Sequence, residues 1–254
     1  MPREDFRAVF RDFEAVLFFA PERFFCAITV NILVKTYAFR YTYRKSIFKK
    51  EQKMYITCLD LEGVLVPEIW IAFAEATGIP ELRKTTRDEP DYDKLMKYRI
   101  NILKEHNLGL KEIQETIAKI DPLPGAKDFL DELRSFTQAI ILSDTFEQFA
   151  APLMKKLGLP TIFCNTLEVS PSGEITGYKM RCEKSKYTTV RALQSCGFET
   201  IASGDSFNDL GMIQASKAGF LFRTTDKIKA EYPQYPAFTE YSELLNAIKK
   251  VVSE

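Results

Sequence analysis

Four short polar segments, spread over about 150 residues of the chain, contain the side chains that chemistry on a phosphate group needs. Three of them follow apolar runs that are typical of strands, at residues 55–59, 139–142 and 200–203. The carboxyl ends of parallel strands meet at the crevice where open α/β sheets bind ligands, so these segments are predicted to converge. The segments are residues 60–64 (Asp-Leu-Glu-Gly-Val), residues 143–145 (Ser-Asp-Thr), Lys186, and residues 204–209 (Gly-Asp-Ser-Phe-Asn-Asp).

Asp60 is the candidate nucleophile. Its attack on a phosphate would form an aspartyl-phosphate and divide one difficult transfer into two easier steps. Taken alone, an aspartate after a strand is more often a turn residue, so the hypothesis depends on the other three segments. Glu62 would protonate the leaving oxygen and later accept a proton from the attacking acceptor. Gly63 would let the backbone turn sharply away from the strand.

Asp205 and Asp209 flank a turn that leads into a helix. Carboxylates close to Asp60 accumulate negative charge unless a cation lies between them, and hard oxygen ligands favour Mg²⁺. We therefore expect Mg²⁺ to bind Asp60, Asp205 and a phosphate oxygen. Asn208 would orient Asp205 or bind the ion through a water molecule. A helix N-cap also explains Asn208 and Asp209, but it leaves Asp205 without a partner.

A phosphate cradle is predicted at the second and third segments. The hydroxyl of Ser143 and the backbone N–H of Asp144 would contact two of the phosphate oxygens. Lys186 would neutralise the phosphate dianion and keep the nucleophile ionised. A lysine near the start of a helix is usually only an exposed charge, and Lys179 and Lys184 lie close enough in the chain to be alternatives.

Composition limits the class of protein. The 254 residues, 46% of them hydrophobic, allow one α/β domain with an inserted subdomain. Residues 1–53 carry 11 Lys/Arg against 6 Asp/Glu, and the remainder carries 24 against 29, which argues against a nucleic-acid-binding protein. The five cysteines form no CxxC pair and His106 is the only histidine, so a Cys/His zinc site is excluded. Reduced thiols in a cytoplasmic protein are expected.

Residues 1–53 differ from the rest of the chain and precede a candidate start at Met54. Their longest uncharged run, residues 24–34, is 11 residues and too short to span a membrane as a helix. Interspersed acidic residues argue against a secretory signal or a transit peptide. Three interpretations remain: a helical extension that packs on the domain or a partner, a segment at a membrane surface, and a stretch outside the functional protein.

From Tyr55 onward, strands and helices alternate, which predicts a mostly parallel, Rossmann-like sheet with helices on both faces. An insertion between the first two strands, at about residues 67–122, is predicted to form a small helical cap. Helices are predicted at residues 67–79, 92–106, 111–119, 126–136, 146–157, 184–196 and 208–217. Strands are predicted at residues 55–59, 139–142, 161–164, 199–203 and 220–222, the last strand of the sheet, with a hairpin turn at residues 171–173.

In this order, the four segments resemble the motifs of the haloacid dehalogenase superfamily of phosphohydrolases: Asp-x-Asp, Ser/Thr, Lys and Gly-Asp-x-x-x-Asp. The resemblance covers residues 54 to about 240. Glu62 departs from the pattern, because most phosphatases of the superfamily have Asp there. This Glu and the runs at residues 58–70, 85–88, 141–146 and 204–209 are similar to a bacterial branch of phosphoserine phosphatases that also transfer the phosphoryl group to homoserine.

The resemblance implies a cytoplasmic, Mg²⁺-dependent enzyme of serine and threonine biosynthesis that takes phosphoserine and homoserine as substrates. It also implies that Glu68 faces the substrate amine and that Arg99 pairs with the substrate carboxylate, a pairing that suits an amino-acid zwitterion. The other implied roles are the following: Asp60 as nucleophile and metal ligand, Glu62 as acid/base and metal contact through its carbonyl, Asp205 as metal ligand, and Ser143, Asp144, Lys186 and Asn208 as phosphate-binding groups.

Two alternatives stay open. The same chemistry could act on another small phosphoester, or the fold could be a nonenzymatic binding module that docks through residues 1–53. The complete set of charged residues in the four segments argues against the binding module. No nucleic acid and no membrane span are expected, and the protein would be a monomer or a homodimer.

Overall fold

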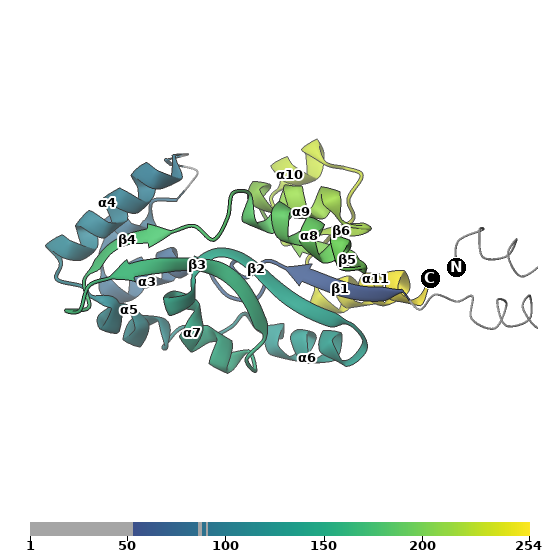
Figure 1. The fold of residues 1–254 in the computed structure, drawn as a ribbon, viewed down its shortest axis with the longest axis horizontal. Helices are drawn as coiled ribbons and strands as arrows, with labels where there is room; N and C mark the ends of the chain where they lie inside the picture. The colour runs from purple at the N-terminus through teal and green to yellow at the C-terminus, as the bar shows by residue number, and fades with distance from the viewer. Residues whose placement is uncertain (1–52, 86–87, 90) are drawn as a thin grey trace, which may run out of the picture. The chain divides into compact units, whose positions relative to one another are not determined.

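The computed structural model describes residues 53–85, 88–89 and 91–254, and Figure 1 shows its fold. Lys53–Glu254 form one compact unit. The predicted extension lies outside the described residues, except for Lys53, and so does part of the run at residues 85–88.

A seven-stranded sheet with the order β4-β3-β2-β1-β5-β6-β7 forms the centre of this unit. All neighbouring strands are parallel except β3 and β4, which form the predicted hairpin. The mostly parallel sheet predicted from the alternating pattern is confirmed. The strands are β1 (Met54–Leu59), β2 (Gln138–Phe146), β3 (Thr161–Val169), β4 (Ile175–Lys179), β5 (Phe198–Gly204), β6 (Ala218–Phe222) and β7 (Ala237–Phe238).

Helices cover both faces of the sheet, because alternate residues of a strand point to opposite sides. On β1, Tyr55 and Leu59 pack into one apolar cluster, whereas Ile56 and Cys58 pack into the other. The first cluster includes residues of α6, α7 and α11, and the second includes residues of α8, α9 and α10 (Figure 1). These helices are α6 (Ala126–Phe136), α7 (Glu147–Lys156), α8 (Ser185–Ser195), α9 (Leu210–Ala215), α10 (Asp226–Glu231) and α11 (Tyr241–Ser253).

The segment between β1 and β2 is helical, as expected. Its elements are α3 (Ile69–Thr77), the 3₁₀ turn η1 (Pro80–Arg83), α4 (Tyr92–Glu105) and α5 (Leu110–Ile117). Gly78 ends α3 in the left-handed conformation that favours glycine, at φ 71°, and its N–H donates to the carbonyl of Ala74. The Asp91 carboxylate caps α4 by accepting from the Lys94 N–H. Apolar contacts join α3 and α5 to α7, so the inserted helices share the core on that side.

Three predictions about the strands and helices are wrong, and each has a physical reason. Strand β2 continues through Ser143 and Asp144 to Phe146, so the predicted cradle lies inside the strand rather than after it. The helix predicted at residues 208–217 begins as the 3₁₀ turn η2 (Phe207–Asp209) before α9. Residues 220–222 are not the last strand, because the two-residue strand β7 follows, and a strand that short leaves no periodic pattern to recognise.

No helix in the described part of the chain is long and apolar enough to cross a membrane. Among the same residues, all four cysteines are free thiols, as expected.

Candidate active site

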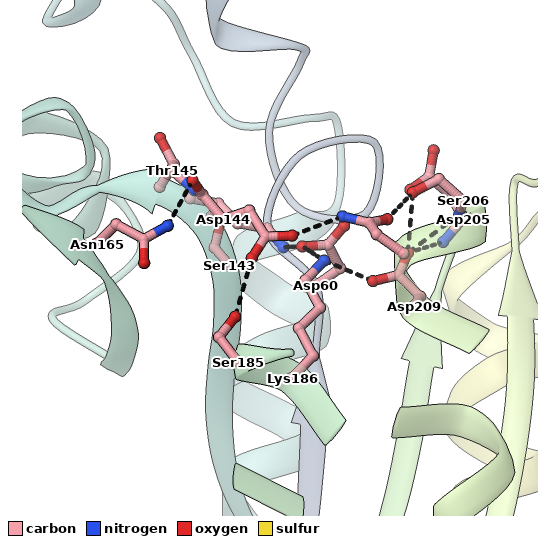
Figure 2. Close-up of polar contacts among 12 residues, drawn as sticks. Asp60, Ser143, Asp144, Thr145, Asn165, Ser185, Lys186, Asp205, Ser206 and Asp209 are labelled. Carbon is pink, nitrogen blue, oxygen red and sulfur yellow. Dashed lines mark hydrogen bonds and ion pairs between the residues drawn. The ribbon is translucent and has the colours of Figure 1, made fainter. Parts of the chain in front are cut away.

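Asp60 lies directly after β1, at the central strand of the sheet, and is 5% exposed. Its backbone N–H donates to the carbonyl of Ser203 at 3.0 Å, which continues the pairing of β1 with β5. Its carboxylate oxygen Oδ1 accepts from the backbone N–H of Leu61 and contacts Lys186 Nζ, both at 2.8 Å (Figure 2). Both contacts fall on Oδ1, so no described residue donates a hydrogen bond to Oδ2.

Lys186 lies in the first turn of α8 and is 4% exposed, whereas the alternatives Lys179 and Lys184 are exposed. Its ammonium lies 2.6 Å from Asp209 Oδ1 and 2.8 Å from Asp60 Oδ1. Burial lowers the pKa of Lys186, but the charges of Asp209 and Asp60 outweigh burial and hold the pKa above its usual value. The lysine nearest the candidate nucleophile is therefore charged at neutral pH.

Asp209 is fully buried and was not among the predicted site residues. While its Oδ1 contacts Lys186, its Oδ2 accepts from the backbone N–H groups of Asp205 and Ser206, both at 3.0 Å. Because an N-cap already explained Asp209, the sequence offered no separate reason to predict this role. Its position four residues after Asp205 is the feature of the sequence that could have indicated it. One carboxylate thus orients both the lysine and the turn that carries Asp205.

Three carboxylates, those of Asp60, Asp205 and Asp209, place oxygens within 4.8 Å of one another. Among the described residues, only the ammonium of Lys186 lies among them, which leaves an excess of two negative charges if all three carboxylates are ionised. Burial and then the charge of Asp209 raise the pKa of Asp60, although Lys186 opposes this, and the same two causes raise the pKa of Asp205 to about 7. An all-oxygen cluster with this excess charge fits a divalent, hard cation such as Mg²⁺.

The turn after β1 approaches Asp205 closely. Gly63 has φ +76°, and a Cβ atom built there would lie 2.5 Å from Asp205 Oδ2. Glycine is required at this position for both its backbone conformation and its lack of a side chain. It is the reason that residues 60–64 can lie against the segment that ends β5.

The predicted phosphate cradle lies beside Asp60, on β2. Ser143 is 2% exposed, and its Oγ accepts from the Thr145 N–H at 3.2 Å. The two carboxylate oxygens of Asp144 accept from Ser185 Oγ and from Asn208 Nδ2, both at 2.9 Å (Figure 2). The side chain of Asp144 therefore links β2 to the start of α8 and to η2. The sequence-based prediction for Asp144 concerned only its backbone N–H.

Asn208 contacts Asp144 rather than Asp205. Its Oδ1 accepts from the hydroxyl of Ser206, which restrains the amide from within its own turn. The backbone carbonyl of Asp205 accepts instead from Thr224 Oγ1, after β6. Asn208 is thus placed to orient the cradle, whereas other residues hold the turn at Asp205.

Glu62, Glu68 and Arg99 form a second charged group. Glu62 Oε2 accepts from the Ile69 N–H at 2.9 Å, at the start of α3. Burial, and then the charge of Glu68, raise the pKa of Glu62 to about 7. A carboxyl group with that pKa can both give and accept a proton near neutral pH.

Arg99 on α4 is 6% exposed and has no acidic partner within ion-pair distance among the described residues. Its guanidinium lies 4.4 Å from the ring centre of Trp70, and its NH2 group donates to the Lys84 carbonyl at 2.8 Å. Its Nε has no hydrogen-bond partner in the described structure. Burial lowers the pKa of Arg99 to about 10, so the group stays charged and is suited to an anionic ligand.

Similarities to known proteins identify the family of this chain. A model of the haloacid dehalogenase-like hydrolases matches residues 57–217. The chain is 51% identical over 200 residues to phosphoserine phosphatase ThrH of Pseudomonas aeruginosa, covering 79% of this chain and 98% of the relative. It is also 51% identical to a phosphoserine phosphatase of Pseudomonas syringae pv. tomato, covering 74% of this chain and 80% of the relative.

A solved structure of a substrate-bound phosphoserine phosphatase complex has the same fold, with a TM-score of 0.65 at 21% identity, and covers 78% of this chain and 99% of that one. The extent of the family match and the identity to the two Pseudomonas proteins place this chain among the haloacid dehalogenase-like hydrolases.

Proposed function

We propose that the protein is a Mg²⁺-dependent phosphoserine phosphatase that forms an aspartyl-phosphate on Asp60 and passes the phosphoryl group to water or homoserine. The observation that carries this proposal is the buried Asp60 carboxylate, held at one oxygen by Lys186 beside two further carboxylates. The names of the two Pseudomonas relatives support phosphoserine as the substrate.

Asp60, Asp205 and the backbone carbonyl of Glu62 would hold the metal ion. When bound, Mg²⁺ would offset the excess negative charge of the cluster and polarise a phosphoryl oxygen. The donor set fits this ion, because every candidate ligand is a hard oxygen.

In the first half of the reaction, Ser143, the Asp144 N–H and Lys186 bind the phosphate oxygens. A carboxylate oxygen of Asp60 attacks phosphorus, and the bond from phosphorus to the seryl oxygen breaks. Protonated Glu62 gives its proton to that oxygen, so L-serine leaves as a neutral alcohol. The pKa of Glu62, about 7, suits this role because a substantial fraction of the group is protonated at neutral pH.

In the second half, ionised Glu62 takes a proton from water or from the hydroxyl of homoserine. The activated oxygen attacks phosphorus, the bond from phosphorus to Asp60 breaks, and the Asp60 carboxylate is restored. The products are inorganic phosphate or O-phosphohomoserine. Both acceptors need the same base, so the pair of acceptors is compatible with one site.

Substrate recognition is proposed to come from Glu68 and Arg99, which would face the amine and the carboxylate of phosphoserine. Arg99 supports this assignment because it is a buried guanidinium with no acidic group within ion-pair distance among the described residues. Both residues belong to the inserted segment at about residues 67–122, which we propose acts as a cap over the site.

The test is ³¹P NMR of the protein with Mg²⁺, phosphoserine and homoserine in one tube. Inorganic phosphate together with O-phosphohomoserine is expected, and phosphate alone would limit the function to hydrolysis. Asp60→Asn should abolish both signals while circular dichroism stays unchanged, whereas the exposed control Asp128→Asn should keep them. Unchanged phosphate release by Asp60→Asn would overturn the mechanism, and no turnover by the natural sequence would turn attention to another phosphoester.

A further inference from the structure

Asn165 on β3 lies outside the four motif segments, yet it is 1% exposed and uses both ends of its amide. Its Nδ2 donates to the backbone carbonyl of Asp144 at 3.0 Å (Figure 2). Its Oδ1 accepts from the backbone N–H of Arg181, also at 3.0 Å. One buried side chain therefore joins the phosphate cradle to the loop that follows β4.

The Asp144 carbonyl needs such a donor because the pairing of β2 with β3 is irregular there. Leu142 pairs with Phe163 and Phe146 with Asn165, so the register shifts between them and the cradle residues bulge from the ladder. A backbone carbonyl that leaves a ladder in the interior requires another hydrogen-bond donor. Asn165 is the principal donor, and the hydroxyl of Tyr92 lies farther away, at 3.4 Å.

The amide oxygen of Asn165 is connected, through Arg181, to the turn that carries Lys186. The guanidinium of Arg181 donates to the Ser185 carbonyl at 3.1 Å, in the first turn of α8, and to Thr189 Oγ1 at 2.6 Å, in the next turn. The Thr189 hydroxyl itself donates to the Ser185 carbonyl at 2.7 Å. The loop and the turn that carries Lys186 are thus one hydrogen-bonded unit, and Asn165 connects that unit to β2.

We propose that Asn165 is a positioning residue that keeps the phosphate cradle and Lys186 at the separation that a phosphoryl group requires. This inference rests on the proposed function of the site. Asn165 itself contacts neither the nucleophile nor Lys186 through any hydrogen bond of the described structure, so it acts through the Asp144 peptide and Arg181. Misplacement of binding groups by about 1 Å is enough to reduce turnover by roughly a hundredfold.

The experiment measures the full chain with Mg²⁺ and compares inhibition by inorganic phosphate with inhibition by L-serine, alongside kcat and KM for phosphoserine. Asn165→Ala is expected to lower kcat at least tenfold and to weaken inhibition by phosphate at least tenfold, while inhibition by L-serine changes less than twofold. Asn165→Asp keeps the acceptor for Arg181 but places a carboxylate against the Asp144 carbonyl, so an equal or larger loss is expected. Arg181→Lys removes one link only and should give a smaller loss of the same kind.

Two controls separate positioning from a general loss of stability. Leu245→Ala creates a cavity under α11, away from the site, and should lower the Tm without changing either inhibition constant. Asn246→Ala, at an exposed position of α11, should change nothing. Equal losses for phosphate and L-serine, or phosphate inhibition within twofold of the natural sequence in both folded Asn165 variants, would overturn the positioning role.

If Asn165→Ala fails to fold, Asn165→Asp and Arg181→Lys decide the question by the same two constants. Failure of the natural sequence to release phosphate from phosphoserine would instead refute the proposed function. The two failures differ in what is observed. If the natural sequence and the Asn165 variants all turn over phosphoserine normally, only the positioning role is refuted.

Discussion

At the residue scale, the buried acidic groups of the site share hydrogen-bond donors and one lysine, rather than each having a cation of its own. Asp209 is the clearest case, because its two oxygens serve different partners: Lys186 on one side and the N–H groups of Asp205 and Ser206 on the other. Only a carboxylate can accept from all three donors at once, since an amide must present an NH₂ group to one side.

Asp209→Asn should therefore reduce kcat for phosphoserine about a hundredfold and lower the Tm. The amide would turn a donor toward Lys186 or toward the two N–H groups, and breaking a buried ion pair costs about 3–5 kcal/mol of stability. Steady-state kinetics and thermal unfolding measure the two effects. Asp128→Asn, on the exposed side of α6, should leave both unchanged, and a kcat within threefold for Asp209→Asn would contradict the assignment.

Arg99→Met should raise KM for phosphoserine roughly 10- to 150-fold, because a hydrogen bond to a charged group contributes about 1.5–3 kcal/mol. For phosphoethanolamine, which lacks the carboxylate, the same substitution should change kcat/KM little. The exposed Lys94→Met on the same helix is the control. An equal loss for both substrates would mean that Arg99 does not read the carboxylate, and another small phosphoester would become the better candidate.

At the element scale, the site is assembled where β1 and β5 end and within the last residues of β2, and α8 and η2 bring charged residues to the same edge. The turn after β1 is the most constrained of these connections. It must bend at once after Asp60 and also make room for the Asp205 carboxylate.

Gly63→Ala should lower kcat more than tenfold and destabilise the fold by about 1 kcal/mol, because an L-residue is strained at a positive φ. The added methyl group would also collide with Asp205 Oδ2. Gly197→Ala is a matched control: its φ is +91°, but a Cβ there meets no atom within 4 Å. Gly197→Ala should lower the Tm by a similar amount with unchanged kcat, and equal kcat losses in the two variants would mean that strain alone explains the effect.

At the scale of the whole molecule, the acidic side chains of the site link the stability of the protein to pH and to metal binding. In the metal-free protein, burial together with neighbouring acids raises the pKa values of Glu62 and Asp205 to about 7, whereas both groups titrate at about 4 in an unfolded chain. The folded state then binds more protons than the unfolded state between these values. The contribution of these two groups to the stability of the folded state is therefore largest below pH 4 and is lost as the pH rises to about 7.

The Tm in EDTA should therefore fall between pH 5 and pH 8, apart from other titrating groups, and Asp205→Asn should make this fall smaller. Mg²⁺ at about 100 times its Kd should restore roughly 2.7 kcal/mol of stability, with the largest gain at pH 8, where the ligands are ionised. Thermal unfolding at four pH values with and without Mg²⁺ measures both effects. A Tm in EDTA that rises from pH 5 to pH 8 would show that the cluster does not control stability in this range.

Residues 54–254 should hydrolyse phosphoserine with a kcat within twofold of the full chain, because Lys53–Glu254 form one compact unit that contains every proposed site residue. Parallel assays of the two proteins measure this. A large loss of activity with retained secondary structure would show that residues 1–53 contribute to the site.

Local sequence patterns were sufficient to predict the parallel sheet and the placement of Asp60 after its central strand. Apolar runs such as residues 55–59 and 200–203 specify strands buried on both faces, and a polar residue that follows such a run must lie at the sheet edge. The helix of residues 126–136 was also predicted with the correct ends, because its apolar positions recur at helical spacing.

Tertiary structure alone decided which charged residues meet. Nothing in the spacing of Lys179, Lys184 and Lys186 shows that only the last is buried against Asp60, because that contact depends on how α8 packs on the sheet. The role of Asn165 was equally hidden, since it arises from a shift in strand register and from a loop 16 residues farther along the chain. Periodicity reports which face a residue points to, whereas hydrogen bonds between distant segments depend on the packed arrangement of the whole domain.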